Sequence, residues 1–413
     1  MAVTVEMPNS PVNSLFVVPW YALKPRTGGG QRSMILMNGL RRAGALEVLV
    51  CQCSRNADIS EVAAHFPDVT FSIHRTEPTE RPGPFANFLS TFLPWRKFMM
   101  VSPSLRKTVL DCLAQRPAHV VVFRRLRVLA QSGLLAGDTQ ARIIVDLDDR
   151  EDHKHAARIT ERYGAAATRA FLALYVRRGF RAVINRKLEP VKQAWLVSSK
   201  DKDGLALSDT RFVPNVPFTA DLATVAGAEN TKPVLLFVGN ATYSPNANGL
   251  EWLLGEVWPK VVALAPDSRL RLVGTGNWSN LKARFGAVGS IEFVGEVDDL
   301  SAEYSQARAA AAPIFSGGGS QIKVVEGCGF ARPVISSVFA VAGYDNPLAQ
   351  AIDKTDDADR FAELCAAYLT NSDLAGQKGK ELRSLKQAQY SKQSVVARVE
   401  GSVRELIKSE PSK

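Results

Sequence analysis

The chain has 413 residues, a net charge of +10 and a pI of about 9.4, with 46% hydrophobic and 22% charged residues. This length suits two domains of roughly 200 residues each, and the composition excludes a disordered or fibrous chain. No apolar run approaches the roughly 20 residues that cross a bilayer, and no zinc finger, RNP-type strand or basic recognition helix indicates nucleic-acid binding. The positive charge therefore points to phosphate-bearing small molecules or an anionic membrane surface as partners.

Short apolar runs alternate with helical patterns along the chain, which is typical of parallel sheets covered by helices. In the first half we expect strands at 15–19, 46–51, 69–73, 119–123, 142–147 and 194–198. In the second half we expect strands at 233–239, 269–274, 290–295, 309–314 and 333–337, and a final helix near 391–408. The interpretation is an α/β chain built from two Rossmann-like domains with parallel sheets.

Two prolines and a small, polar stretch separate the halves and mark a linker. The predicted organisation is an N-terminal, acceptor-side domain at 1–215, a linker at 216–231, a nucleotide-sugar domain at 232–388, and a helix at 389–413 that packs back on the first domain.

A glycine-rich loop follows the first strand, as Thr27-Gly-Gly-Gly-Gln-Arg32. Because it comes at the carboxyl end of a strand, where open α/β sheets bind ligands, Gly28, Gly29 and Gly30 would let it reach a ligand, and Arg32 could meet a phosphate. The alternative is a flexible surface turn.

Three carboxylates, Asp146, Asp148 and Asp149, follow the fifth strand at the same edge. Clustered carboxylates raise one another's pKa, which suits a general base for the acceptor hydroxyl. Asp148 is therefore one candidate catalytic residue. The alternative is that these acids only complement the first turn of a helix.

The segment F-S-G-G-G-S-Q-I-K-V-V-E-G, from Phe315 to Gly327, is the sharpest local signal. A buried strand runs into Gly317, Gly318 and Gly319, whose backbone amides can approach an anion at the start of the next helix. We expect Ser320 to be the N-cap, Lys323 to lie one turn inside, and Glu326 to follow on the same face about 9 Å from the helix start. This spacing suits a diphosphate and a ribose diol. The alternative is a tight turn followed by a surface Lys–Glu pair.

The run G-G-G-S-Q-I-K-V-V-E-G-C-G-F-A-R-P-V-I-S-S resembles the donor site of family 4 glycosyltransferases, in the subgroup with a G-G-G-[ST]-R-x-K-x-x-E motif. Leu235 to Val261 is similar to the opening of that family's donor domain, Val18 to Arg32 to its first loop, and Val145 to Asp152 to a strand-end acidic segment. The resemblance implies the GT-B fold, in which two Rossmann-like domains face each other across a cleft. It also implies retaining transfer without a metal or other cofactor.

The resemblance carries over residue by residue in the second domain. Glu326 matches the glutamate that binds the donor's ribose, and Lys323, the second candidate catalytic residue, matches the lysine one turn before it. Gln321 stands where the subgroup has Arg, and Gly318 stands where the usual pattern has its first Glu. The usual diphosphate Arg and Lys are replaced by Asn240 and Asn248, so Gly239, Asn240 and Asn246 are the expected neutral donors there; an ordinary βα turn is the alternative.

Two basic, aromatic segments, Thr168 to Lys187 and Phe85 to Met100, have the composition of interfacial helices. An alternative is a core helix whose arginines extend to solvent.

The sequence thus predicts a cytoplasmic enzyme, either free or peripheral at the inner membrane face. It would transfer a sugar from a nucleotide-diphosphate sugar to a hydroxyl of a glycan or lipid-linked acceptor in cell-surface polysaccharide synthesis. Alternatives are a nucleotide-sugar epimerase on the same fold and a GT-B-derived binding protein that has lost turnover.

Overall fold

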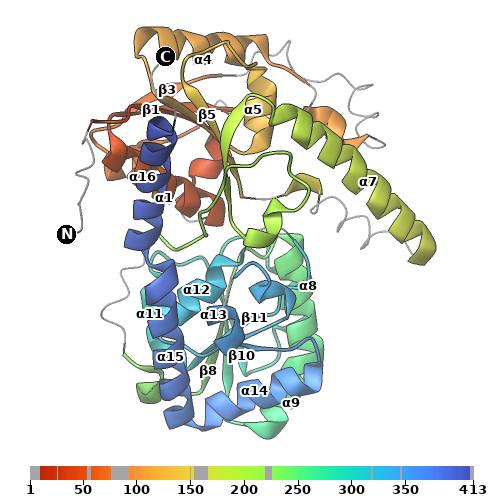
Figure 1. Ribbon diagram of the computed structural model, residues 1–413. Coiled ribbons are helices and arrows are strands. Elements are labelled where there is room, and N and C mark those ends of the chain that lie inside the picture. The colour runs from red at the N-terminus through yellow and green to blue at the C-terminus, as the bar shows by residue number, and fades with distance from the viewer. Residues whose placement is uncertain are drawn as a thin grey trace, which may run out of the picture. The chain divides into compact units, whose positions relative to one another are not determined.

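The computed structural model describes residues 10–25, 27–53, 57–75, 93–98, 100–148, 150–152, 166–218, 226–317, 320–344 and 347–409. The chain divides into two compact units (Figure 1). The first unit contains the described residues up to Leu196, together with Asp201–Val213 and the segment that begins at Gln393. The second contains Val197–Lys200 and Pro214–Lys392.

The first unit is built on a seven-stranded parallel sheet with the order β3-β2-β1-β4-β5-β6-β7. Its strands are β1 (Ser14–Pro19), β2 (Leu46–Cys51), β3 (Thr70–Ile73), β4 (Val120–Arg124), β5 (Arg142–Leu147), β6 (Val191–Leu196) and β7 (Thr210–Phe212). The central strands β1, β4 and β5 are nearly continuous apolar runs, because a parallel sheet is covered on both faces. β1 and β4 pair in register, with Val17 opposite Phe123, and both side chains are fully buried.

Helices pack on both faces of this sheet. They are η1 (Trp20–Leu23), α1 (Gly28–Ala43), α2 (Ser60–His65), η3 (Pro94–Phe98), α4 (Pro103–Gln115), α5 (Leu126–Ser132), α7 (Ala166–Lys187), η4 (Ser199–Lys202) and α16 (Lys392–Lys408). The last helix packs directly on α1, where a Cβ added to Gly39 would lie 2.5 Å from the Cβ of Val399. The C-terminal helix is therefore part of the core of the first unit.

The second unit is built on a six-stranded parallel sheet with the order β10-β9-β8-β11-β12-β13. Its strands are β8 (Val234–Val238), β9 (Arg269–Val273), β10 (Ile291–Gly295), β11 (Ala309–Ala312), β12 (Val334–Ser336) and β13 (Asp353–Lys354). Its helical elements are η5 (Ala228–Asn230), α8 (Ser244–Trp252), the π-helical turn η6 (Leu253–Val257), α9 (Trp258–Leu264), α10 (Ser279–Phe285), α11 (Leu300–Gln306), α12 (Ile322–Gly329), η7 (Phe339–Val341), α13 (Leu348–Ala351), α14 (Ala358–Thr370) and α15 (Ser372–Tyr390).

The central strand β11 consists of four alanines, all buried, and this lets α12 lie close to the sheet. A Cβ added to Gly327 of α12 would meet Val334 Cγ2 at 2.9 Å and Ala310 Cβ at 3.3 Å. Small residues on both the strand and the helix therefore bring the α12 backbone close to β11 and β12.

The observed sheets confirm the predicted α/β class, and every predicted strand is present within a few residues. The sixth strand, β6, begins earlier than expected, at Val191. The reason is that Gln193, which is polar but buried, interrupts the apolar pattern in the sequence. The Gln193 amide donates to Asp209 Oδ2 at 3.0 Å and accepts from Trp195 Nε1 at 2.9 Å, so its burial is satisfied. The short edge strands β7 and β13 were not predicted, since three and two residues are too few for an alternating pattern.

α7 is a 22-residue helix (Figure 1), and its buried and exposed apolar side chains lie on opposite faces. Val176, Phe180 and Ile184 are buried, whereas Phe171 and Tyr175 are 70% and 45% exposed. Within the described part of the chain, no helix combines the length and the apolar character that spanning a membrane requires.

Candidate functional site

The glycine-rich segment of the second unit joins β11 to α12. Gly317 has a φ of +124°, in the region that favours glycine, whereas Gly318 and Gly319 lie outside the described residues. The helix begins at Ile322 with Gln321 as N-cap, so the prediction that Ser320 caps the helix was wrong. The reason is that the extended Gln321 already accepts the first helical hydrogen bond, from the amide of Val324 at 2.9 Å. Ser320 is nevertheless buried at the helix start.

The turn after β8 approaches the same helix. The ammonium of Lys323 donates to Asn246 Oδ1 at 2.8 Å and lies 4.2 Å from the centroid of the Phe237 ring. Asn246 Nδ2 in turn donates to the carbonyl of Asn240 at 2.9 Å. A Cβ on Gly239 would meet Asn246 Nδ2 at 2.8 Å and Lys323 Nζ at 3.0 Å. The structure thus brings four of the predicted donor-site residues together, and the absence of a side chain at 239 leaves room for this approach.

A second contact holds the turns of β8 and β9 together. A Cβ on Gly274 would lie only 2.1 Å from the carbonyl oxygen of Gly239, and Gly274 has a φ of +135°. Gly276, with a φ of +104°, sits against Asn240 Oδ1 in the same way. Asn240 Oδ1 also accepts from the amide of Thr242 at 2.8 Å. The turns after β8 and β9 therefore pack against each other and form one continuous polar surface.

Glu326 lies one turn further along α12 from Lys323 and is only 5% exposed. Its Oε2 accepts from the hydroxyl of Tyr304 at 3.3 Å. Burial raises the pKa of Glu326 to about 7, while the Tyr304 hydroxyl and the Lys323 charge oppose that rise. Burial likewise lowers the pKa of Lys323 to about 7, against the opposing charge of Glu326. Two groups of opposite sign thus titrate near neutral pH at one helix face, which is typical of a ligand-binding site.

In the first unit, the glycine triplet belongs to the first turn of α1 instead of a free loop. Thr27 caps this helix, accepting from the amide of Gly30 at 3.1 Å. A Cβ on Gly30 would lie 1.8 Å from the Lys24 carbonyl oxygen, so this position requires glycine for a close backbone approach. Gly28 and Gly29 form the exposed amino end of the helix.

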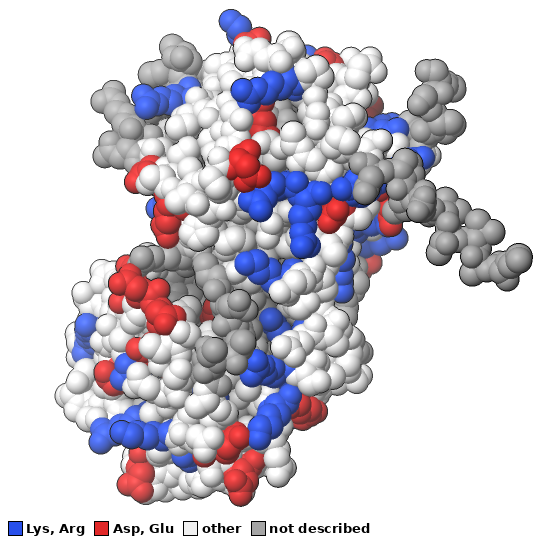
Figure 2. Space-filling model, turned by 90° about the vertical axis from the view of Figure 1, so that its left-hand side faces the viewer, with Lys and Arg blue, Asp and Glu red and all other residues white. Residues whose placement is uncertain are grey.

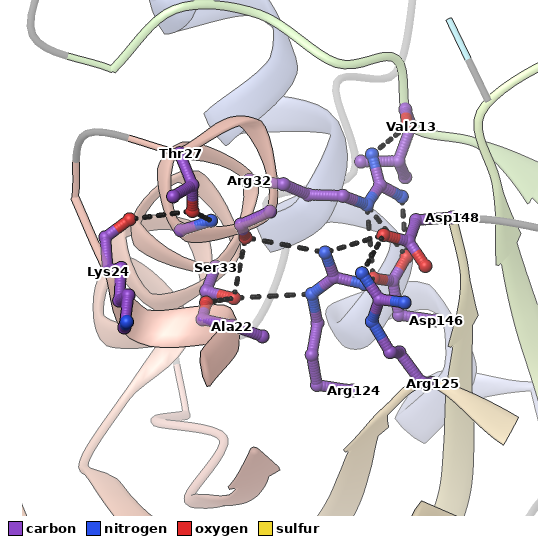
Figure 3. A network of polar contacts seen from close by, with 12 residues as sticks. Ala22, Lys24, Thr27, Arg32, Ser33, Arg124, Arg125, Asp146, Asp148 and Val213 are labelled. Carbon is purple, nitrogen blue, oxygen red and sulfur yellow. Dashed lines mark hydrogen bonds and ion pairs between the residues drawn. The ribbon is translucent and has the colours of Figure 1, made fainter. Parts of the chain in front are cut away.

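Arg32 lies in a buried network of arginines and aspartates, drawn in Figure 3. Its guanidinium contacts both carboxylate oxygens of Asp146, at 3.0 Å from Nε to Oδ2, and donates to the carbonyl of Val213 at 2.7 Å. Arg124 bridges the two aspartates, at 2.8 Å to Asp146 and 2.7 Å to Asp148. Arg32 is 2% exposed, so the geometry does not support the expected phosphate contact.

Asp148 is the candidate base in this network. Burial alone would raise the pKa of Asp148, but the charges of Arg124 and Arg125 outweigh burial and hold that pKa well below its usual range. A carboxylate kept ionised in this way has little affinity for a proton. The geometry therefore does not support a base at Asp148, and Asp149 lies outside the described residues.

Comparisons with known proteins match these observations. Residues 232–371 match the family model described as glycosyl transferases group 1. The sucrose-phosphate synthase of Thermosynechococcus elongatus has a similar structure, with a TM-score of 0.67 and 15% identity over 97% of this chain and 100% of that one. Anabaena HepE in complex with UDP and glucose has a TM-score of 0.63 and 10% identity over 97% and 100% of the two chains. WaaG, a glycosyltransferase involved in lipopolysaccharide biosynthesis, has a TM-score of 0.60 and 13% identity over the same shares. The comparison with curated proteins finds no match.

Residues 232–371 are thus a domain of the glycosyl transferases group 1 family, and the two sheets have the fold of these solved glycosyltransferases. The matched domain contains the whole Lys323–Glu326 site. A cation and the amino end of a helix suit an anionic group, and a carboxylate one turn away suits a pair of hydroxyls. We refer to Gly239, Asn246, Lys323 and Glu326 as the donor site, after the sequence prediction: the first three approach one another, and Glu326 lies one turn beyond Lys323 on α12.

Sequence reasoning missed three polar residues of these sites. Tyr304 contacts Glu326 from α11, 22 residues away, and no motif connects the two. Arg124 and Arg125 follow β4 directly. Arg125 has a φ of +80°, which is costly for a residue with a side chain. The signal that could have revealed Arg124 and Arg125 is the unusual pair of arginines at the carboxyl end of an otherwise apolar strand.

The two basic, aromatic segments of the first unit meet in the structure. Trp95 of η3 packs edge-on against Tyr175 and Phe180 of α7, with ring centroids 5.2 and 6.0 Å apart. A Cβ on Gly179 would lie 2.6 Å from the Trp95 ring, so this glycine forms the notch that the indole fills. Figure 2 shows Lys and Arg side chains gathered in a band across one face of the first unit. The rest of the predicted 85–100 segment is largely outside the described residues.

Proposed function

We propose that this glycosyltransferase moves a sugar from a nucleotide-diphosphate sugar to a hydroxyl of a glycan or lipid-linked glycan acceptor, with retention of anomeric configuration, in cell-surface polysaccharide synthesis. The observation that carries the proposal is the pair Lys323 and Glu326 on one face of α12, the first partly buried and the second buried, both with a pKa near 7. The retaining outcome follows from the resemblance of the 316–337 segment to family 4 enzymes.

The donor site would hold the nucleotide as follows. The amino end of α12 and the Lys323 ammonium stabilise the diphosphate, both as ligand and as leaving group. Asn246, which already accepts from Lys323 at 2.8 Å, fixes the ammonium in place. Glu326, ionised, accepts hydrogen bonds from the ribose diol. Structures of Anabaena HepE with UDP-glucose and of S. aureus TarM with UDP and alpha-GlcNAc-glycerol make UDP the first probe to use.

The acceptor class is supported by two observations. WaaG and TarM are among the similar structures, and WaaG is described as acting in lipopolysaccharide biosynthesis. In the first unit, α7 exposes Phe171, Leu174 and Tyr175 on one face. From Thr168 to Lys187 it carries six cations and no acid, a combination that suits an anionic lipid surface.

Calorimetry with UDP tests the donor assignment. Glu326→Ala should weaken UDP binding by about 1–3 kcal/mol, because a charged hydrogen bond is lost. Lys282→Ala, on the solvent-exposed helix α10 of the same unit, is the matched control and should leave affinity unchanged. Unchanged affinity in Glu326→Ala would remove the ribose assignment. Turnover of a nucleotide sugar without any acceptor, with a changed sugar and no released UDP, would indicate the epimerase instead.

Vesicle sedimentation tests the membrane assignment. Replacing Arg177 and Arg178 together by Gln should lower partition onto vesicles containing phosphatidylserine by roughly 30-fold, at about 1 kcal/mol per cation. Phe171→Ser should also lower it, whereas Leu135→Ser, which changes a residue 65% exposed elsewhere in the unit, should not. Equal loss in both serine variants would contradict a specific role for α7.

A further inference from the structure

Tyr304 is held rigidly beside the donor site. Its side chain is 1% exposed and its ring stacks on Phe330, with centroids 4.4 Å apart and planes 12° from parallel. Its carbonyl oxygen accepts from the Nε of Arg332 at 2.8 Å, so the backbone is fixed as well. With ring and backbone both held, the hydroxyl is directed at the Oε2 of Glu326.

Among the described residues, the Tyr304 hydroxyl donates a hydrogen bond to the Glu326 carboxylate. A buried carboxylate with few hydrogen-bond donors is costly to keep ionised. A hydroxyl that donates to it favours the ionised form and fixes the plane of the carboxylate. Both effects matter for a group that must accept from a diol.

We infer that Tyr304 is a positioning residue of the donor site, which holds the Glu326 carboxylate ionised and oriented for the ribose of the nucleotide. This assignment rests on the proposed function for the ribose contact. The effect of Tyr304 on the orientation and ionisation of Glu326 in the free protein does not depend on that function.

Other groups also act on this carboxylate. Lys323 of α12 favours the ionised form of Glu326. Tyr344, in the turn after η7, has a pKa that burial raises and to which the Glu326 charge adds. Arg332, after α12, faces Tyr304, and Lys386 of α15 acts on Cys328 instead of Glu326. Of these groups, Tyr304 contacts the Glu326 carboxylate directly in the described structure, so a change confined to its hydroxyl isolates this contribution.

The test is the titration of Glu326 in the whole protein without ligand. The chain is labelled with ¹³C at the glutamate side-chain carboxyl, and the Glu326 signal is assigned by its loss in Glu326→Gln. Its midpoint, about 7 in the wild type, should move upward by about 1 pH unit in Tyr304→Phe, since a hydrogen bond to a charged group is lost. Phenylalanine keeps the stack on Phe330, so folding is preserved. Tyr368→Phe is the matched control, because its hydroxyl also donates to a carboxylate, that of Asp353, elsewhere in the unit.

UDP affinity is the second measurement. Relative to the wild type, Tyr304→Phe should bind UDP about fivefold more weakly at pH 7, and the ratio should fall below about twofold at pH 9, where Glu326 is ionised in both proteins. An unmoved midpoint, or a loss of affinity that is equal at every pH, would overturn the inference. If the midpoint moves but Glu326→Ala leaves UDP affinity unchanged, the proposed ribose contact fails while the effect of Tyr304 on Glu326 stands.

Discussion

The two units bury ionic groups in opposite ways. In the first, Arg32 and Arg124 meet Asp146 and Asp148 at hydrogen-bond distance, and arginine charge keeps the pKa of Asp148 well below its usual range. In the second, the partly buried Lys323 and the buried Glu326 form no ion pair with each other among the described contacts, and both have a pKa near 7. A neutralised buried network is structural, whereas buried charges left to titrate near neutrality mark a place where a ligand supplies the missing partners.

The largest effect expected from this contrast is on stability in the first unit. Asp146→Ala would leave Arg32 and Arg124 buried without this partner and should lower the free energy of unfolding by about 3–5 kcal/mol. Chemical denaturation followed by tryptophan fluorescence measures it. Arg211→Ala breaks the exposed Arg211–Glu405 pair of the same unit and should cost less than about 1 kcal/mol. Equal costs in the two variants would show that the network is not structural.

In the second unit, removing a buried charge should stabilise the protein instead of destabilising it. Because the pKa of Glu326 is about 7 when folded and 4.5 ordinarily, the stability this group contributes is complete below pH 4.5 and is lost as pH rises through 7. At pH 8 the free energy of unfolding of Glu326→Gln, which mimics the protonated form, should therefore exceed that of the wild type by about 3 kcal/mol, and the difference should close near pH 4.5. Denaturation curves at both pH values check this, and a gap independent of pH would contradict it.

A smaller effect is expected on the pH dependence of UDP affinity. Glu326 loses its charge below about pH 7 and Lys323 loses its charge above it. Affinity should therefore be highest near pH 7, about threefold weaker at pH 6 and pH 8, and about eightfold weaker at pH 5.5 and pH 8.5. Calorimetry compares the pH profile of UDP affinity in the wild type with that in Glu326→Gln. The phosphate of the nucleotide itself takes up a proton near pH 6, and this affects both proteins equally. The difference between the two profiles below pH 7 therefore reports Glu326. Superimposable profiles would contradict a titrating Glu326.

The smallest effect is expected at Gly239. In Gly239→Ala the added methyl meets only the ends of the Asn246 and Lys323 side chains, at 2.8 and 3.0 Å, which can shift by a few tenths of an ångström. Unfolding free energy should change by less than about 1 kcal/mol, while UDP affinity should fall about threefold because the ammonium is displaced. Gly289→Ala is the control, because a Cβ added at this position meets no atom within 4 Å. An equal loss of UDP affinity in Gly289→Ala would show that displacement of the Lys323 ammonium is not the cause.

The fold could be predicted because each of the predicted strands is a short, mainly apolar run, and several run directly into a glycine. The donor site could be predicted in part, since Lys323 and Glu326 share a helix face and Gly239 follows a strand. Tyr304 could not be predicted, because its contact with Glu326 depends on how α11 and α12 pack. The buried network around Arg32 and Asp148 could not be predicted for a related reason: Arg124 and Asp146 come from neighbouring strands, and only the strand register brings them together.

The all-alanine strand β11 sets how closely α12 can approach the sheet, since a Cβ added to Gly327 would lie 2.9 Å from Val334 Cγ2 and 3.3 Å from Ala310 Cβ. A larger side chain at position 310 would push the helix, and with it Lys323 and Glu326, away from the sheet. Under the proposed function, position 310 would therefore tune nucleotide affinity, although it touches no substrate and its substitution alters no group that binds.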